Sequence, residues 1–466
     1  MTMWCPDLSR HAGPAYCAIA DAVGAAVASG RLAPGDRLPP QRDLAYRLGL
    51  SLNTVTRGYA EAIRRGYLDG AVGRGTYVRT PPADRPAAEG ARAALTRPVA
   101  GPIDFANNLP FRGSAADALA RTLAGLAADT ALGALLDHKP DVALDRHAEA
   151  GRRWIATLGL DGSGRRVVLT SGAQHGLLVT LLALTRPGDA ILVEELTYPP
   201  LLAIARRLGL HVFPVALDGE GVAPAALDEL CRTTAARVLC CTPTLQTPTA
   251  VTMGAERRRA IADLAERHRL TVVEDDVFGF LPAARPAPLA AYAPDRTVLV
   301  ASTSKSLAPG LRVGYLHAPE RLEAALRSAV ALSSWMPPPL MAEVATRWIE
   351  DGTAERLNAE QRAEARHRRE MARAMLAGGV LAGSPDGFHL WLPLPDPWSP
   401  DGFEAAARRL GVEVRGGPRF AVDARARPAA VRLCLSHEID RERVEIGLRT
   451  IARLLDGGYD ADAFLV

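Results

Sequence analysis

Short amphipathic stretches, each followed by a glycine, make up most of the first eighty residues. Apolar residues recur in them at helical spacing. Pro40 suits the first position of the second stretch, and Ser51 suits the N-cap of the third. Two strand-like pieces follow, at residues 67–68 and 76–78. The pattern predicts a winged helix-turn-helix domain over residues 1–79, with helices at 16–29, 40–48 and 52–65.

The pattern changes after this domain. Residues 80–102 show no apolar period and are rich in Pro, Ala and charge, which predicts a linker. From residue 103 to 466, strand-like apolar runs alternate with helical stretches such as 176–184 and 255–269. This alternation predicts an α/β domain on a mostly parallel sheet with helices on both faces, and a small C-terminal α+β subdomain from about residue 355. The predicted strands are 167–169, 190–194, 212–215, 238–241, 271–273 and 298–301.

Charge is shared unevenly between the two predicted domains. The 466-residue chain has a formal net charge of +3, but residues 1–80 hold ten Arg and six Asp or Glu, a net of +4. A basic domain indicates a polyanion partner, although a solvated face gives the same count. The longest apolar run, 177–184, is too short to cross a bilayer, so we expect a cytoplasmic protein with no membrane partner. The cysteines show no metal-ligand spacing, and we expect no metal site.

The third predicted helix would lie in the major groove of DNA, with the residues at its start facing base edges. Arg42, near the start of the second helix, and Arg74, between the strand-like pieces, suit phosphate groups. The alternative is a three-helix domain that binds another protein. On the DNA interpretation, the residues that face the bases are Ser51, Asn53, Thr54 and Thr56.

Lys305 stands out because lysine is nearly absent. The chain holds two lysines, Lys139 and Lys305, so 53 of its 55 basic residues are arginine. An arginine stays protonated, whereas a partly desolvated lysine amine can form a Schiff base. Lys305 lies among the hydroxyls of Ser302 and Ser304, and Arg312 follows; such groups suit a phosphate. A lysine beside a phosphate site indicates pyridoxal 5′-phosphate, with a surface lysine in a serine-rich turn as the alternative.

Other candidate residues follow the remaining predicted strands, at the end where parallel sheets bind ligands. The turn at 170–174 precedes a helix and offers free N–H groups to an anion. Tyr198 suits either stacking on a planar ring or packing in the core. The carboxylates at 274–276 suit a metal, a surface cluster or a ring nitrogen, and only the ring nitrogen fits beside a lysine and a phosphate. Arg432 lies in an apolar run and needs a carboxylate, from the protein or from a ligand.

The N-terminal domain closely resembles the GntR-type DNA-binding domain. The resemblance rests on residues 29–39, Arg42-Asp43-Leu44-Ala45, Leu48-Gly49, Asn53-Thr54-Val55 and Gly73-Arg74-Gly75-Thr76. One departure is Leu52, which stands where the family usually has a base-reading arginine, so the operator sequence does not carry over. The resemblance implies DNA contacts from Arg42, Ser51, Asn53, Thr54, Thr56 and Gly73.

The body resembles a fold-type I aminotransferase domain over roughly residues 103–466. The resemblance implies pyridoxal 5′-phosphate as the cofactor, with Lys305 forming its internal aldimine and Asp275 pairing with its ring nitrogen. Tyr198 would stack on the ring, and Arg432 would take a substrate α-carboxylate. The residues that would hold the phosphate are Ala173, Gln174, Ser302, Ser304 and Arg312.

Two departures from aminotransferases bear on chemistry. The family usually carries Asn-Pro-Thr-Gly, and a tyrosine three residues after the aspartate; both contact the phenolic oxygen of the cofactor. This chain has Gln246-Thr247-Pro248-Thr249-Ala250 and Phe278 at those places. The changes favour a sensor over an efficient enzyme, although the hydroxyl of Thr247 offers a replacement contact.

A GntR-type domain fused to an aminotransferase-like body resembles the MocR-type transcriptional regulators across the whole chain. The resemblance implies a regulator that binds a double-stranded DNA operator and senses a small amino compound through Lys305. It also implies a head-to-tail homodimer in which each DNA-binding domain lies over the body of the other subunit. Two alternatives stay open: a working aminotransferase with a DNA tether, and a DNA-binding protein whose body is a dimerisation scaffold.

Overall fold

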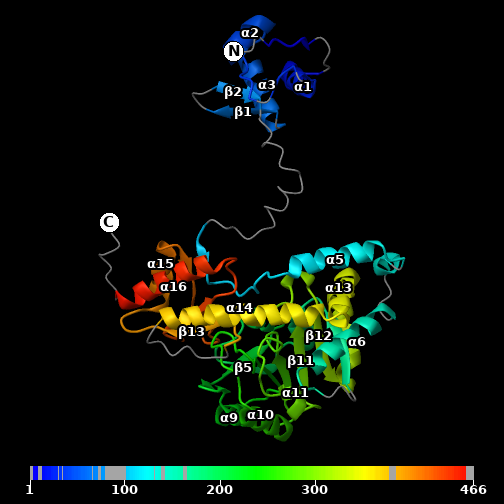
Figure 1. Cartoon of the computed structure of the whole chain (residues 1–466), viewed down its shortest axis with the longest axis vertical. Helices are drawn as coiled ribbons and strands as arrows, with labels where there is room; N and C mark the ends of the chain where they lie inside the picture. Colours follow the sequence, from blue (N-terminus) through cyan, green and yellow to red (C-terminus); the bar gives the residue numbers. More distant parts are fainter. Residues whose placement is uncertain are drawn as a thin grey trace. The chain divides into compact units, whose positions relative to one another are not determined.

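The computed structural model describes residues 4–8, 13–29, 31–33, 35–65, 67–71, 75–78, 101–130, 132–137, 142–160, 165–376 and 385–457. The chain forms two compact units, Met1–Pro98 and Val99–Val466, each with its own hydrophobic core (Figure 1). Nearly all of the expected linker at 80–102 lies outside the described residues. Within the described ranges, no helix is both long and apolar enough to cross a membrane.

The first unit is the predicted winged helix-turn-helix. Its elements are α1 (Ala15–Ala28), α2 (Gln41–Leu48), α3 (Leu52–Arg64), β1 (Leu68–Ala71) and β2 (Gly75–Val78). β1 and β2 pair antiparallel, with Leu68 opposite Val78. Ile19 of α1 and Tyr59 of α3 are buried in the core that these helices share. The sequence predicts Pro40 at the first position of this helix, but α2 begins at Gln41 and Pro40 is its N-cap residue.

A seven-stranded sheet forms the centre of the second unit, in the order β4-β12-β11-β10-β9-β5-β6. Neighbouring strands are parallel except at β12, which is antiparallel to both β4 and β11. All the predicted strands are present, whereas β12 is not predicted, because Gly314, His317 and Pro319 interrupt its apolar pattern. The strands are β4 (Arg165–Thr170), β5 (Ala190–Glu194), β6 (His211–Val215), β9 (Val238–Cys241), β10 (Thr271–Asp275), β11 (Thr297–Ser302) and β12 (Gly314–Pro319).

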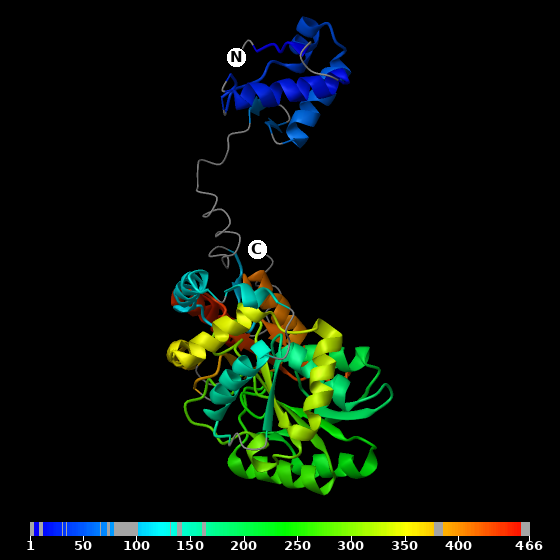
Figure 2. The same ribbon diagram turned by 90° about the vertical axis from the view of Figure 1, so that its right-hand side faces the viewer.

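Helices cover both faces of this sheet, as Figure 2 shows. Alternate residues of β11 point to opposite faces. Val298 and Val300 pack in the core with residues of α7 (Ala173–Leu184), α8 (Pro199–Arg207) and α12 (Glu320–Ser334). Leu299 and Ala301 pack in the core with residues of α5 (Ala115–Ala127), α6 (Val142–Ala156) and α13 (Pro339–Glu350). The other elements of this unit around the sheet are η2 (Leu132–Leu136), β7 (Leu217–Asp218), β8 (Gly221–Val222), α9 (Pro224–Thr233), α10 (Ala255–Arg267), α11 (Leu289–Tyr292) and η3 (Pro309–Leu311).

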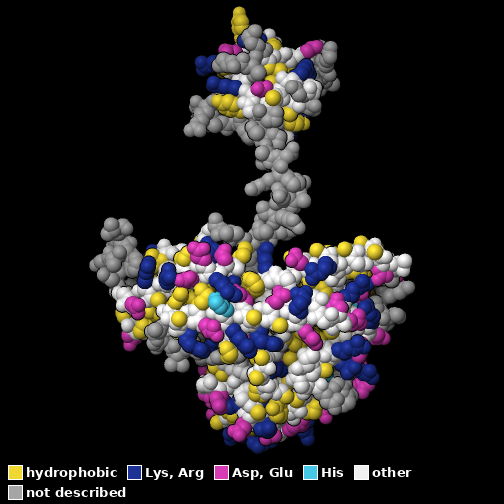
Figure 3. Space-filling view, viewed as in Figure 1, with side chains coloured by type: hydrophobic (Ala, Val, Ile, Leu, Met, Phe, Trp, Pro, Cys, Tyr) yellow, Lys and Arg dark blue, Asp and Glu magenta, His cyan; other side chains and the backbone are white. Residues whose placement is uncertain are grey.

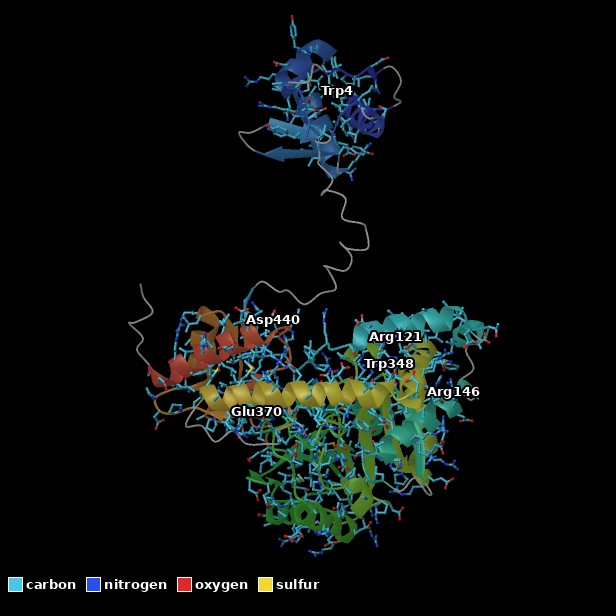
Figure 4. All side chains as sticks on the ribbon, viewed as in Figure 1. Trp4, Arg121, Arg146, Trp348, Glu370 and Asp440 are labelled. Atoms are coloured by element: carbon cyan, nitrogen blue, oxygen red, sulfur yellow. The ribbon has the colours of Figure 1, made fainter. Side chains whose placement is uncertain are left out.

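Trp348 joins α13 to α5. The ring is 1% exposed, and its Nε1 donates a hydrogen bond to Oγ1 of Thr122 at 2.8 Å. Arg146 of α6 forms ion pairs with Glu343 and Glu350 on the same helix α13, and Figure 4 shows Arg146 and Trp348 at one end of the body. These contacts hold three helices together on one face of the sheet. On the face of the body that Figure 3 shows, acidic and basic side chains are intermixed.

The long helix α14 (Thr353–Met375) leads from the sheet to a small subdomain (Figure 1). It begins at Thr353, close to the predicted boundary at residue 355. In the small subdomain, β13 (His389–Pro393), β16 (Ala430–Cys434) and β15 (Arg415–Gly416) form an antiparallel sheet, and α15 (Pro400–Arg409), η4 (Gly417–Phe420) and α16 (Arg441–Asp456) surround it. The first strand of the body, β3 (Ile103–Asp104), pairs with β14 (Val412–Glu413). The segment that opens the body is therefore attached to the small subdomain.

Candidate functional site

A cavity of about 190 Å³ lies at the carboxyl ends of β9, β10 and β11. Ser302, a predicted site residue, is fully buried and does not line the cavity, but its Oγ donates a hydrogen bond to Oγ of Ser304 at 2.9 Å. A larger cavity, of about 560 Å³ and lined by Trp154, Phe280 and Arg362, holds none of the predicted site residues. The predicted residues that line the smaller cavity are Ala173, Gln174, Tyr198, Thr247, Asp275, Phe278, Ser304, Lys305, Arg312 and Arg432.

The amine of Lys305 faces this cavity from the turn after β11. It donates a hydrogen bond to the backbone oxygen of Asn108 and lies 5.6 Å from the centre of the Phe278 ring. Burial lowers the pKa of the Lys305 amine to about 8, and the cationic Arg432 acts in the same direction. A substantial fraction of the amine is therefore neutral near pH 8, the form that attacks an aldehyde.

Asp275 ends β10 beside this amine. Its side chain is 9% exposed, and its Oδ1 accepts a hydrogen bond from the backbone N–H of Val277 at 3.3 Å. Burial raises the pKa of Asp275 to about 7, and the neighbouring Asp276 adds to the rise. No described cation forms an ion pair with Asp275. A buried carboxylate of this kind is stabilised by a cationic partner from a ligand, such as a protonated ring nitrogen.

The two carboxylates beside Asp275 point to other partners. Glu274 accepts backbone hydrogen bonds from Leu289 and Ala290 and forms an ion pair with Arg258. Asp276 forms an ion pair with Arg285 at 2.8 Å. Glu274 and Asp276 therefore form structural ion pairs, whereas Asp275 lines the cavity. This arrangement favours the ring-nitrogen interpretation of Asp275.

The start of α7 and Arg312 form one wall of the cavity. Gly172 is the N-cap of α7 with φ at 89°, and Ala173 and Gln174 follow in the first turn, where backbone N–H groups have no partner within the helix. Arg312 adopts φ of 53° and donates from Nη2 to the backbone oxygen of Ser171 at 3.1 Å. The positive φ of Gly172 favours glycine, and a Cβ there would also lie 2.8 Å from Nη2 of Arg312, which would have to move. N–H groups, a guanidinium and the hydroxyl of Ser304 suit a phosphate.

Arg432 reaches the cavity from β16 of the small subdomain. Its Nη2 donates to the backbone oxygen of Ala106 at 2.7 Å, and its guanidinium lies 4.8 Å from the centre of the Phe420 ring. The side chain is 9% exposed, and its Nε is buried without a hydrogen-bond partner. No acidic side chain among the described residues pairs with it, contrary to the internal-partner alternative. A ligand carboxylate would supply the missing charge.

Asn108, which the sequence analysis does not assign to the site, lines the cavity and contacts the buried ring of His389. Nε2 of His389 lies 3.0 Å from the backbone oxygen of Gln246, so it carries the proton. Its Nδ1 then accepts from Nδ2 of Asn108 at 3.2 Å. Burial lowers the pKa of His389 to about 3, so the ring is neutral. Asn108 lines the cavity, and its segment carries no periodic signal that reveals this from the sequence.

The two departures from the aminotransferase pattern both lie at the cavity. Phe278 is 2% exposed and packs 5.4 Å from the ring of His389. The amide of Gln246 points away, donating to Glu194 at 3.0 Å and to the backbone oxygen of Leu196 at 2.6 Å. Thr247 is therefore the residue of that segment that lines the cavity.

In the first unit, the predicted DNA-facing residues gather at the start of α3. Ser51 is the N-cap of α3, and its Oγ accepts a hydrogen bond from the backbone N–H of Thr54 at 3.1 Å. Asn53, Thr56 and Arg42 are exposed. Gly73 and Arg74, predicted in the wing, lie outside the described residues.

Comparison with known families agrees with both halves of this description. The family of bacterial regulatory proteins called gntR matches residues 15–78, and aminotransferase class I and II matches residues 147–451. The second family and the donor set of the cavity identify pyridoxal 5′-phosphate as the cofactor. The first implies that the N-terminal unit binds DNA.

Three curated relatives share the whole architecture. The uncharacterized HTH-type transcriptional regulator YdeF of Bacillus subtilis is 30% identical, over 97% of this chain and 97% of its own. The HTH-type transcriptional regulator TauR of Rhodobacter capsulatus is 31% identical, over 92% and 94%. The vitamin B6 salvage pathway transcriptional repressor PtsJ of Salmonella typhimurium is 27% identical, over 91% and 95%.

Among solved structures, the kynurenine aminotransferase of Pyrococcus horikoshii has the same fold. It is 22% identical, with a TM-score of 0.69 over 80% of this chain and 95% of that one. The aminotransferase fold, the gntR-family domain and the full-length relatives agree on one architecture. This chain belongs to the MocR-type transcriptional regulators, in which a GntR-type winged helix is joined to a fold-type I aminotransferase-like domain.

Proposed function

We propose that this regulator senses a small amino compound that carries a carboxylate, through a cofactor held on Lys305. One observation carries the proposal: the buried guanidinium of Arg432 has no acidic partner among the described residues and lines the same cavity as Lys305 and Asp275. The cavity thus combines a lysine that can hold an amine-binding cofactor with a guanidinium that has no acidic partner among the described residues. An α-amino acid offers both matching groups.

Each of these cavity residues would have its own role in holding the cofactor or the ligand. The bound cofactor supplies an aldehyde that captures primary amines. Lys305 would hold that aldehyde until an amine replaces it, and the lowered pKa of Lys305 supports this role. Asp275 would keep a proton on the ring nitrogen. Arg432 would orient the carboxylate, and the segment from Ala173 with Arg312 would hold the phosphate.

Coupling to DNA would run through the segment that opens the body. Arg432 donates to the backbone oxygen of Ala106, and Lys305 donates to that of Asn108. A ligand on Arg432 and a cofactor on Lys305 would compete for these donors. The segment would then shift with the small subdomain, to which β3 is paired. A ligand controls DNA binding in this way only if it binds more tightly to one position of this segment, shifted or unshifted, than to the other.

We also propose the head-to-tail homodimer, acting in the cytoplasm where the operator lies. Several large apolar side chains of the body are exposed to solvent in the single chain: Leu136 is 86% exposed, Leu332 85% and Trp335 58%. Apolar side chains of this size are commonly covered by a partner subunit.

Aminotransferase activity is the second candidate. The presence of Lys305, Asp275 and Arg432 in one cavity favours it, and Phe278, which has no hydroxyl, opposes it. The test that separates the two is turnover, measured as keto acid formed from each amino acid of a panel. A body that served only as a dimerisation scaffold would not need such a cavity.

The experiment that tests the sensor uses the full-length protein with its cofactor and a fluorescent operator duplex. Amino acids, amines without a carboxylate and, because PtsJ is named for vitamin B6 salvage, B6 vitamers are added in turn. The proposal predicts that one carboxylate-bearing amine changes operator affinity or the shape of the complex. It also predicts that the change is lost in Arg432→Gln. If every compound leaves DNA binding unchanged, the sensor proposal is wrong.

A further inference from the structure

The start of α3 presents one apolar side chain among polar ones. Leu52, the first residue of α3, is 42% exposed, and Ser51, Asn53 and Thr56 around it are exposed as well. Farther along the same helix, Val55 is buried in the core of the domain. The apolar face of α3 therefore continues past the core and into solvent at the end of the helix that meets DNA bases.

The polar residues around Leu52 are partly engaged within the domain. Oγ of Ser51 and Oγ1 of Thr54 share a hydrogen bond of 2.8 Å, and Oγ1 of Thr56 donates to Oε1 of Gln41 at 2.8 Å. Within the described residues, no hydrogen bond engages the side chain of Asn53. Leu52 and Asn53 are thus the side chains at the start of α3 that are free to meet a base.

Leu52 also borders a cleft of about 430 Å³ between α2, α3 and β2, together with Arg37, Arg42 and Thr76. Guanidinium groups on the rim of such a cleft suit the phosphates on either side of a groove. Asp43 also lines the cleft, so two guanidinium groups face one carboxylate, and the remaining positive charge fits DNA as the occupant.

We infer that Leu52 reads the 5-methyl group of a thymine in the major groove of the operator. An alkyl side chain has no donor or acceptor, and thymine is the base whose major-groove edge carries a methyl group. The chain would therefore favour thymine where an arginine at this position would favour guanine. The inference rests on DNA binding by the first unit and not on the sensing of an amino compound.

The test begins with selection of operator duplexes from a randomised library by the full-length protein. Each thymine of the selected site is then replaced by deoxyuridine, which removes only the methyl group, and affinity is measured by fluorescence anisotropy. At one base pair per DNA-binding domain, we expect the replacement to weaken binding about fourfold, the value of one buried methyl group. Leu52→Ala should bind the thymine and deoxyuridine duplexes equally.

Ile63→Ala is the matched control, because Ile63 is 40% exposed on α3 but at its opposite end. It should keep the full sensitivity to deoxyuridine. Leu52→Arg, put through the same selection, should recover guanine at the affected position. If wild type tolerates deoxyuridine at every thymine, or if Leu52→Ala keeps the sensitivity, Leu52 only caps the core and the inference is overturned.

Discussion

The guanidinium of Arg432 donates a hydrogen bond to the backbone oxygen of Ala106 across 2.7 Å. The two residues are far apart in sequence, and the bond joins the small subdomain to the segment that opens the body. Arg432 also lines the ligand cavity, so this bond connects the cavity directly to the segment that opens the body.

Arg432→Gln should weaken the binding of a carboxylate-bearing effector by about 10- to 100-fold, since hydrogen bonds to a charged group contribute roughly 1.5–3 kcal/mol. Binding of the matching amine without a carboxylate should change little. Spectral titration of the cofactor measures both. Arg449→Gln, at a surface position of α16, is the control and should leave both affinities as they are. Equal losses for the acid and the amine would show that Arg432 does not bind the carboxylate.

Lys305→Met should stabilise the cofactor-free protein, and the gain should depend on pH. The folded-state pKa of Lys305 is about 8, below the unfolded value of about 10.4. Between these values the unfolded chain binds more protons than the folded one, so the stability of wild type rises with pH. Below pH 8 the burial cost of the charge is present in full, and the variant gains up to roughly 3 kcal/mol.

Urea unfolding of both cofactor-free proteins from pH 7 to pH 10 measures this gain. It should shrink steadily toward pH 10, where the wild-type lysine is neutral in the folded state. A gain that stays constant across this range would mean that the amine of Lys305 is not held in its lowered-pKa environment.

Phe278→Tyr should raise the rate at which the protein converts an amino acid to a keto acid. The ring lies 5.6 Å from the amine of Lys305, so a hydroxyl there would supply a donor at the cofactor. One hydrogen bond of about 1.4 kcal/mol, made only in the transition state, corresponds to about a tenfold increase. Phe278→Leu, which adds no hydroxyl, should show no increase. If wild type turns over as fast as Phe278→Tyr, the missing hydroxyl does not limit catalysis and the enzyme hypothesis gains.

Leu332→Asp should convert the protein from a dimer to a monomer, because Leu332 is 85% exposed in the single chain and a charge would oppose its burial by a partner. Light scattering after gel filtration gives the mass directly. Leu410→Asp, at a 42% exposed position of the small subdomain, is the control and should stay dimeric. A dimeric Leu332→Asp protein would place the interface elsewhere.

The sequence predicts the parallel strands and the chemical groups at their ends because both are local. Strands such as β11 are unbroken apolar runs, and Lys305 is conspicuous where nearly every other cation is arginine. Asn108 depends instead on contacts between distant segments: the pairing of β3 with β14 and the hydrogen bond to His389 bring it to the cavity. His389 packs on Phe278 and also forms hydrogen bonds with Asn108 and with the backbone oxygen of Gln246. No local pattern carries such information.

The most direct test of the sensor proposal uses two samples of the purified protein with pyridoxal 5′-phosphate. One sample is reduced with borohydride for peptide mass analysis, and the other, unreduced, is titrated with amino compounds and followed by absorption. We expect a visible absorption band that borohydride removes, a reduced cofactor attached to Lys305, and no band in Lys305→Ala. In the unreduced sample, an amino acid should shift the band stably, without release of keto acid. If no chromophore binds, or if the cofactor is attached to Lys139, the cavity around Lys305 is not the sensor site.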